Sequence, residues 1–186
     1  MLKSYAVALL GAMVLGGCGE VVSYSGPVAI NLKQKSSDVV NATISTEKSI
    51  TSESGNPYGA FIKTAQQNLG GADPSRVELA SATLLLGAGS TGATSLEQVL
   101  TGRADVLFVM NDTGNNYPAA SVTNPTGPGP VPLSVSFDSG AFVGVDRSKL
   151  LSGSFKVVLR GPAASTFVGK AADVELQTTF NFHALK

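Results

Sequence analysis

The sequence predicts a mainly-β protein, a single antiparallel β-sandwich, and three observations support this fold class. Charged residues make up only 14% of the 186 residues, whereas glycine and proline number 21 and 9, a composition typical of short strands joined by many turns. Several segments alternate apolar and polar side chains, and this period of two gives a strand one buried face. The chain has no internal repeat of the length that builds solenoids or propellers.

The alternation is clearest in the last segment of the chain, at 173–183. Val174, Leu176, Phe180 and Phe182 line one face of this segment, and polar side chains line the other. Burying each of these four apolar side chains contributes roughly 1.5–3 kcal/mol, so we expect the segment to be paired inside a sheet. The other strands are expected at about 28–33, 40–45, 77–86, 104–110, 131–137, 141–145 and 154–160.

One amphipathic helix is expected at about 57–69. Asn56 suits its N-cap position, and Pro57 suits its first turn. One face of this helix is apolar at the spacing of a helical stripe, which predicts packing against the core. The stripe consists of Tyr58, Phe61, Ile62, Ala65 and Leu69. Two short helical turns are also expected, at about 95–101 and 145–153.

The segment 84–112 contains the pattern Gly87-x-Gly89-x-x-Gly92 between two apolar runs. In dinucleotide-binding folds such glycines form a tight turn and let the backbone approach a pyrophosphate, and an acidic residue about 20 residues further on binds a ribose. Asp112 stands at that distance from the last glycine. The order of the parts therefore matches a cofactor-binding unit.

Other features favour a turn between strands instead of a cofactor site. The helical turn at 95–101 is too short for a crossover between parallel strands, which needs about a dozen residues or more. Thr94 and Glu97 have the spacing of a capping box, which accounts for both residues without a phosphate. No strand–helix alternation follows Asp112 to complete a parallel sheet. We therefore interpret the glycine pattern as a chance match and expect no cofactor.

The first residues have the organisation of a secretory signal. Lys3 supplies a positive charge, and the uncharged apolar stretch Tyr5–Leu15 is shorter than the ~20 residues of a membrane-spanning helix. The run LGGC that follows resembles the lipobox of bacterial lipoproteins. This resemblance implies cleavage before Cys18 and attachment of lipid to its thiol. In that family Gly19, directly after the cysteine, favours the outer membrane over the inner one.

This resemblance implies a signal peptide at 1–17 and a lipidated Cys18 with a short tether at 18–27, and the alternating segments predict a β-sandwich domain at 28–186. Cys18 is the only cysteine, which excludes an intrachain disulfide. Without Lys3 the chain carries 12 basic and 13 acidic side chains and no basic block. Nucleic acid is therefore not an expected partner, and the lipid is the expected link to the membrane of the cell envelope.

The segment 111–132, NDTGNNYPAASVTNPTGPGPVP, is rich in proline and glycine and predicts one long loop. Long loops in compact domains are often functional, so this segment is the candidate interaction loop. A calcium site is the alternative, but a single carboxylate provides little charge, and a turn supported by Asn and Asp side chains is favoured. The candidate contact residues are Asn111, Asp112, Asn115, Asn116 and Tyr117.

The sequence contains no recognisable catalytic or metal-binding constellation. His183 is the only histidine, so a Ser–His–Asp site or a zinc site would depend on it. No serine stands in a G-x-S-x-G elbow, since Ala88 replaces the first glycine before Ser90. We therefore expect no catalytic residues and no metal.

These features favour a lipid-anchored cell-envelope protein whose β-sandwich is a non-catalytic structural, accessory or protein-interaction module. Its partner is expected to be another envelope protein, contacted through exposed strand edges or the 111–132 loop. The alternatives are a small-ligand-binding or surface-adhesion module that uses this loop, and an enzyme. A pocket with converging polar groups would favour the ligand-binding module, and a cleft that combines acidic residues or His183 with serine would favour the enzyme.

Overall fold

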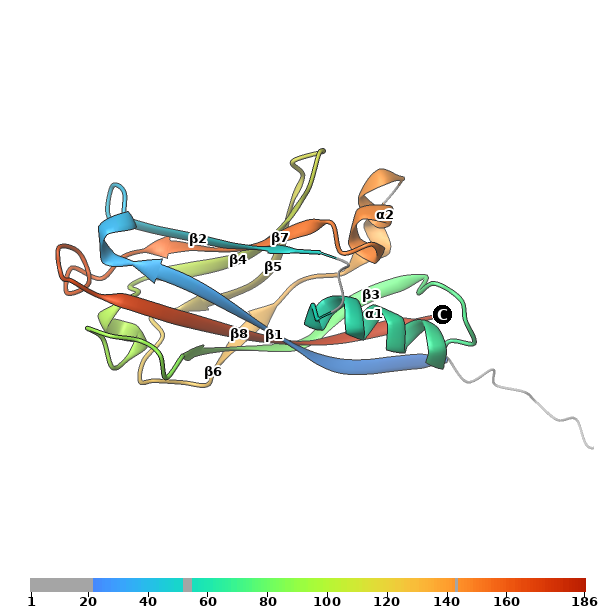
Figure 1. The fold of residues 1–186 in the computed structure, drawn as a ribbon, viewed down its shortest axis with the longest axis horizontal. Helices are drawn as coiled ribbons and strands as arrows, with labels where there is room; N and C mark the ends of the chain where they lie inside the picture. Colours follow the sequence, from blue (N-terminus) through green and yellow to red (C-terminus); the bar gives the residue numbers. More distant parts are fainter. Residues whose placement is uncertain (1–21, 52–54, 143) are drawn as a thin grey trace, which may run out of the picture.

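The computed structural model describes residues 22–51, 55–142 and 144–186, and within them eight strands form one antiparallel sheet (Figure 1). The order of the strands in the sheet is β1-β8-β3-β6-β5-β4-β7-β2. The predicted mainly-β, antiparallel fold is confirmed. The strands are β1 (Ser23–Lys35), β2 (Thr43–Ile50), β3 (Arg76–Leu86), β4 (Arg103–Met110), β5 (Asn116–Thr123), β6 (Val131–Val135), β7 (Phe155–Pro162) and β8 (Asp173–Leu185).

The sheet folds over on itself into two layers (Figure 1). One layer contains β1, β8 and β3, and the other contains β5, β4, β7 and β2. The short strand β6 joins the layers, because its Leu133 pairs with Ala82 of β3 while its Val135 pairs with Ala120 of β5. The result is a sandwich that is nearly closed into a barrel, with the edge strands β1 and β2 facing each other.

The longest strands, β1 and β8, are the first and the last in the chain, and they pair along their whole length. Ser23 lies opposite Leu185, so the start of β1 and the end of β8 lie side by side. All four apolar side chains predicted to face inward from β8 are buried, which confirms the predicted C-terminal strand. The predicted tether at 18–27 is wrong in its second half, because β1 already begins at Ser23. Pro27 is tolerated inside β1 because this strand lies at an edge of the sheet.

An aromatic cluster fills the middle of the core. Phe108 of β4 is fully buried, and its ring lies 4.7–6.0 Å, between centroids, from the rings of Phe137, Phe155, Phe180 and Phe182. Aromatic pairs at these separations add stability beyond the area they bury. Since the rings come from β4, β7, β8 and the segment after β6, this cluster ties the two layers together.

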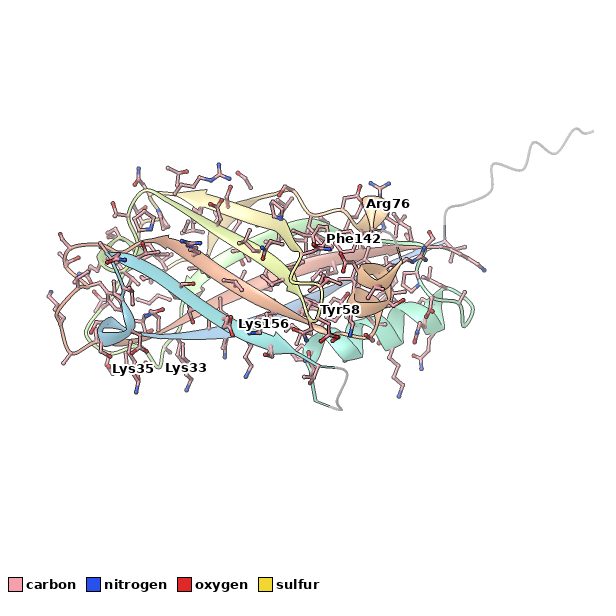
Figure 2. The ribbon with its side chains drawn as sticks, turned by 90° about the horizontal axis from the view of Figure 1, so that it is seen from above. Lys33, Lys35, Tyr58, Arg76, Phe142 and Lys156 are labelled. Carbon is pink, nitrogen blue, oxygen red and sulfur yellow. The ribbon has the colours of Figure 1, made fainter. Side chains whose placement is uncertain are left out.

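Helix α1 (Pro57–Asn68) lies against the first half of β1 and confirms the predicted amphipathic helix (Figures 1 and 2). The side chain of Asn56 accepts a hydrogen bond from the Tyr58 N–H at 2.9 Å and thereby caps the first turn. Tyr58 is buried, with its ring edge-on to Phe155 and Phe182 at 5.0 and 5.2 Å between centroids. The helix therefore covers the core where β1 and β2 move apart.

The strand predicted at 141–145 is wrong. A 3₁₀ turn, η3 (Ser139–Ala141), and a helix, α2 (Val145–Leu151), occupy this region. Asp138 caps η3 by accepting a hydrogen bond from the Gly140 N–H at 2.8 Å. Such local side-chain bonds to the backbone compete with strand pairing, and here they override the apolar alternation. Helix α2 confirms the helical turn predicted at 145–153.

The single loop predicted at 111–132 is also wrong, because β5 occupies its middle. The register between β4 and β5 shifts, with Val106 opposite Ala120 but Leu107 opposite Pro118, so Ala119 is an additional residue in β5. This β-bulge interrupts the pairing locally and lets a proline lie inside the sheet. What remains of the loop is a turn at 111–115 and a segment at 124–130.

Candidate functional site

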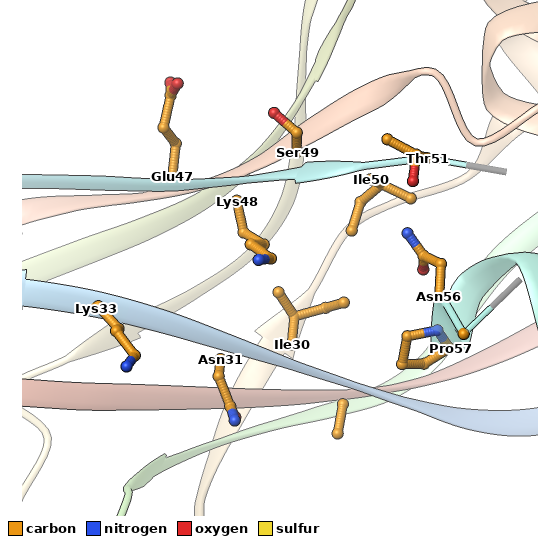
Figure 3. Close-up of a pocket in the computed structure, with 12 residues that line it drawn as sticks. Ile30, Asn31, Lys33, Glu47, Lys48, Ser49, Ile50, Thr51, Asn56 and Pro57 are labelled. Carbon is orange, nitrogen blue, oxygen red and sulfur yellow. The ribbon is translucent and has the colours of Figure 1, made fainter. Parts of the chain in front are cut away.

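A groove of 840 Å³ lies between the edge strands β1 and β2 (Figure 3). Its volume falls within the range of ~300–1,000 Å³ typical of ligand sites. Its walls are residues 29–33 of β1, except the buried Leu32, and residues 47–51 at the end of β2. The residues that lead into α1, among them Asn56 and Pro57, close one end.

The groove exists because β1 and β2 diverge. Where the chain passes from one strand to the other, the Thr46 hydroxyl donates a hydrogen bond to the Lys33 carbonyl at 2.7 Å. Beyond this bond, the described part of β1 pairs only with β8 and that of β2 only with β7, and the two strands spread apart toward α1 (Figure 1). Each strand therefore presents an unpaired backbone edge, which is a template for an added strand.

The floor of the groove is apolar, and a lysine reaches into it. Ile30 and Ile50 point toward each other between the strands and are buried (Figure 3). Lys48 extends from the same side of β2 as Ile50, whereas Glu47 and Ser49 point away from β1 (Figure 3). The groove therefore combines an apolar base with one inward-pointing cation.

The neighbouring lysines are paired with carboxylates. Lys33 lies 3.5 Å from Glu175 of β8, and Lys156 of β7 lies 2.6 Å from Glu47. Figure 2 shows Lys33 projecting into the solvent beside Lys35 at the edge of β1. Lys48 forms no ion pair with any carboxylate in the described part of the chain. It is the cation that an incoming anionic group would meet in the groove.

The predicted contact residues lie elsewhere, at the β4–β5 turn beside α2. The carboxylate of Asp146 in α2 organises them. It accepts hydrogen bonds from the Thr113 hydroxyl and the Asn115 side-chain amide, both at 2.7 Å, and from the Tyr117 hydroxyl at 2.5 Å. Asp146 is only 6% exposed, so these donors replace the water that the charge would otherwise bind. The structure therefore brings Asn115 and Tyr117 together, around a protein carboxylate.

This cluster shifts the pKa values of its members in opposite directions. The Tyr117 hydroxyl, helped by the side chains of Asn115 and Thr113, holds the pKa of the Asp146 carboxyl below its usual range. The same hydrogen bond to Asp146 raises the pKa of the Tyr117 phenol. At neutral pH the pair is therefore a carboxylate and a neutral phenol, the protonation states that this geometry needs.

The other three predicted residues do not converge on one point. Asp112 forms an ion pair with Lys149 of α2, and the Asn111 side chain donates to the Ser154 hydroxyl at 3.2 Å. Asn116 is exposed at the start of β5, opposite Val109. Among the described residues, no group of three or more potential metal ligands is present. Asp112 and Asn111 hold the turn against α2 and against Ser154, the residue before β7.

The glycine pattern packs tightly against β8. The Gly87 N–H donates to the Glu175 carbonyl at 2.7 Å, and a Cβ placed on Gly89 would lie 2.9 Å from a Glu175 carboxylate oxygen. The place where a pyrophosphate would approach therefore holds a negative charge. Gly92 has a φ of +78°, and a Cβ there would lie 2.9 Å from the Ala172 Cα, so the turn itself requires glycine. This packing supports the interpretation of the pattern as a turn.

The capping box predicted after this turn is wrong, although the helical turn is present as η2 (Leu96–Gln98). The Thr94 N–H donates to the Gln98 side chain at 2.8 Å, and Glu97 accepts a hydrogen bond from the Gly127 N–H at 2.7 Å. Glu97 therefore helps to fix the 124–130 segment through a long-range contact, which a capping box does not predict.

His183 lies beside an ion-pair network on the outer face of the sheet. Its Nδ1 lies 3.1 Å from Glu78, which also pairs with Arg76 at 3.0 Å. Arg76 in turn binds both carboxylate oxygens of Asp138, and this guanidinium holds the pKa of Asp138 below its usual range. Within the described residues, the side-chain hydrogen bond of His183 goes to Glu78 and not to a serine.

Cys18 and the predicted signal peptide at 1–17 lie outside the described residues. In the part of the chain that the structure describes, no helix combines the length and apolar character needed to cross a membrane. The described chain begins at Val22, and β1 begins five residues after Cys18.

The predicted site residues did not include the groove, although the sequence carries a signal for it. Every second residue of β2 faces the buried side of the strand, and three of these residues are buried: Ile44, Thr46 and Ile50. Lys48 has the same orientation but is exposed and charged. The predicted strand ended at 45 and therefore did not include Lys48.

No protein-family model matches the chain, and no curated protein and no solved structure matches it either.

Proposed function

We propose that this protein is a lipid-anchored, non-catalytic interaction module of the cell envelope, which binds an extended segment of a partner protein between β1 and β2. The observation that carries the proposal is the pair of unpaired strand edges that face each other across a groove of 840 Å³. An added strand forms main-chain hydrogen bonds with such an edge, and the neighbouring side-chain pockets select its sequence.

The dimensions of the groove suit a short peptide. Residues 29–33 of β1 provide ~13 Å of edge at ~3.3 Å per residue, which is enough for about four or five residues of an extended segment. The Thr46–Lys33 hydrogen bond limits the groove at one end, and Pro57 at the start of α1 limits it at the other. Ile30 and Ile50 lie at the base of the groove with only 5% and 2% of their surfaces exposed, so the inward side chains of the segment would extend the core beside them.

The resemblance to a lipobox supports the proposed location. A lipid on Cys18 would hold Ser23, five residues away, close to the bilayer. Ala29 and Lys33 follow Ser23 by six and ten residues, which is roughly 20 and 33 Å along the strand. The groove would then lie away from the membrane surface, where a soluble segment of another envelope protein can reach it. Gly19 favours the outer membrane as the site of anchoring.

A ligand-binding or adhesion module that uses the 111–132 segment stays a prediction. We give priority to the groove because the polar groups of the β4–β5 turn are bound to Asp146, Lys149 and Ser154. A contact there would first have to break these bonds, whereas the edges of β1 and β2 are already unpaired.

Photo-crosslinking in cells from single positions tests the proposal. A photoreactive amino acid replaces Asn31, which lines the groove, and in a matched variant it replaces Ser134, an exposed residue of β6 outside the groove. We expect Asn31 to crosslink to one segment of one envelope protein, and Ser134 not to do so. Cys18→Ala, which removes the anchor, should abolish the crosslink.

The crosslinked segment is then synthesised and added to the purified protein. It should slow hydrogen exchange of the β1 and β2 amides that border the groove. Equal crosslinking from Asn31 and Ser134 would contradict the proposal, and so would a synthetic segment that protects other strands instead.

A further inference from the structure

We propose that the segment bound in the groove carries an acidic side chain opposite Lys48 and an aliphatic side chain two residues away from it. This inference rests on the proposed function and adds the side-chain chemistry that the groove selects. Lys48 is then the residue that determines specificity.

The first argument is the position of Lys48 in β2. Inward-facing residues of this strand are buried at Ile44, Thr46 and Ile50, but Lys48, which has the same orientation, is exposed. An edge lysine with its side chain turned inward lies over the groove and not over the outer face, as Figure 3 shows. A strand added beside β2 would therefore cover it.

The second argument is the charge around Lys48. The Glu47 side chain points away from β1 and pairs with Lys156, and Glu175 pairs with Lys33. Covering the Lys48 ammonium with an apolar segment would remove water from a charge without providing a partner, which is unfavourable. An aspartate or glutamate on the segment restores a partner. The N-terminal end of α1 borders the same groove and has the same sign of partial charge.

The third argument gives the spacing. Residues directly opposite on neighbouring strands have Cβ atoms ~4.5–5.5 Å apart, close enough for a carboxylate to reach an ammonium. Lys48 and Ile50 are two residues apart on one face of β2, so their partners on the added strand are also two residues apart. The segment opposite them therefore has one acidic and one aliphatic residue separated by a single position.

An inward-pointing lysine on an edge strand can also prevent two copies from pairing edge to edge. This role makes a different prediction, because replacing Lys48 with an uncharged residue would then cause self-association. A second copy of the chain is thus the competing occupant of the groove. Sedimentation of a Lys48→Met variant would detect this second copy as a dimer or larger species.

The test is selection of binders from a random heptapeptide display library on the full-length lipidated protein in detergent. The wild type should enrich peptides with Asp or Glu two positions from Ile, Leu or Val. Lys48→Glu should enrich Lys or Arg at the acidic position instead. Lys35→Glu is the matched control, because Lys35 is an exposed lysine of β1 outside the groove, and it should keep the wild-type consensus.

A synthetic peptide with the wild-type consensus should bind Lys48→Glu ~10-fold more weakly than wild type, since an attraction becomes a repulsion near the protein surface. Lys35→Glu should bind this peptide within about twofold of wild type, because Lys35 lies outside the groove and salt screens its exposed charge from the peptide. Peptides that protect β1 and β2 from exchange but have no acidic preference would overturn this inference and leave the proposed function standing. Failure to enrich any peptide that protects these strands would contradict both this inference and the proposed function. Self-association of Lys48→Met would overturn the inference in another way, because Lys48 would then serve to prevent edge-to-edge pairing of two copies.

Discussion

The hydroxyl of Tyr58 offers a sharp test of the fold, because the structure predicts that removing it stabilises the protein. Tyr58 is 1% exposed, and its hydroxyl has no hydrogen-bond partner in the described part of the chain. The neighbouring rings of Phe61, Phe155 and Phe182 provide no acceptor. Burial without a partner also raises the pKa of this phenol.

A buried polar group without a partner destabilises a fold by about 1–3 kcal/mol. Tyr58→Phe removes this group and keeps the ring, so we expect the free energy of unfolding to rise by about that amount. For a domain of this size, each 1 kcal/mol corresponds to a shift in Tm of about 2–4 °C. The variant should therefore melt about 2–12 °C above the wild type.

Tyr117→Phe is the matched control, because the same chemical change should there have the opposite sign. The Tyr117 hydroxyl donates to the Asp146 carboxylate at 2.5 Å, and its loss should lower the free energy of unfolding by about 1.5–3 kcal/mol, the range for a hydrogen bond to a charged group. Urea denaturation followed by circular dichroism measures both variants under identical conditions. A loss of stability in Tyr58→Phe would refute the reasoning, since it would mean that the buried hydroxyl has a partner.

Three further predictions concern the turn glycines, the Asp146 cluster and the core. Gly92→Ala should lower the Tm more than Gly114→Ala does. Both glycines have positive φ, so a side chain strains the backbone by about 1–2 kcal/mol at either position. Only at Gly92 would the new Cβ also meet a neighbour, 2.7 Å from the Ala172 Cβ. The stability that the wild type gains from the lowered pKa of Asp146 is present above the ordinary pKa of aspartate, about 4, and is lost as the pH falls through the lowered value. Asp146→Asn should therefore be less stable at pH 7 but show a shallower loss in acid, as measured by urea titrations across pH. Phe108→Ala should lower the free energy of unfolding by about 3–5 kcal/mol, and a value below 1 kcal/mol would mean that the aromatic cluster does not join the layers.

Local patterns in the sequence were enough to predict the elements whose stability depends on nearby residues. Alternation over 173–183 predicted the C-terminal strand, since a period of two buries one face whatever the strand pairs with. Asn56 and Pro57 predicted where α1 begins, because a cap acts within one helical turn.

Contacts between distant residues decided the rest. Pro118 lies in a strand because a bulge opposite Val106 and Leu107 accommodates it, and this depends on β4. Likewise, Glu97 accepts a hydrogen bond from the Gly127 N–H of a remote segment, and nothing in the local pattern around Glu97 indicates this partner.

The candidate site shows the same division between sequence and structure. The sequence by itself places Lys48 two residues from Ile50 and four from Ile44, in one alternating row, and it places Cys18 in a lipobox-like run. Only the tertiary structure decided that β1 and β2 become the two edges of one sheet, that they diverge beyond Thr46, and that Lys48 lies over the groove between them. Sheet order is set by pairing between strands far apart in the chain, and a period of two within one strand carries no information about its neighbours.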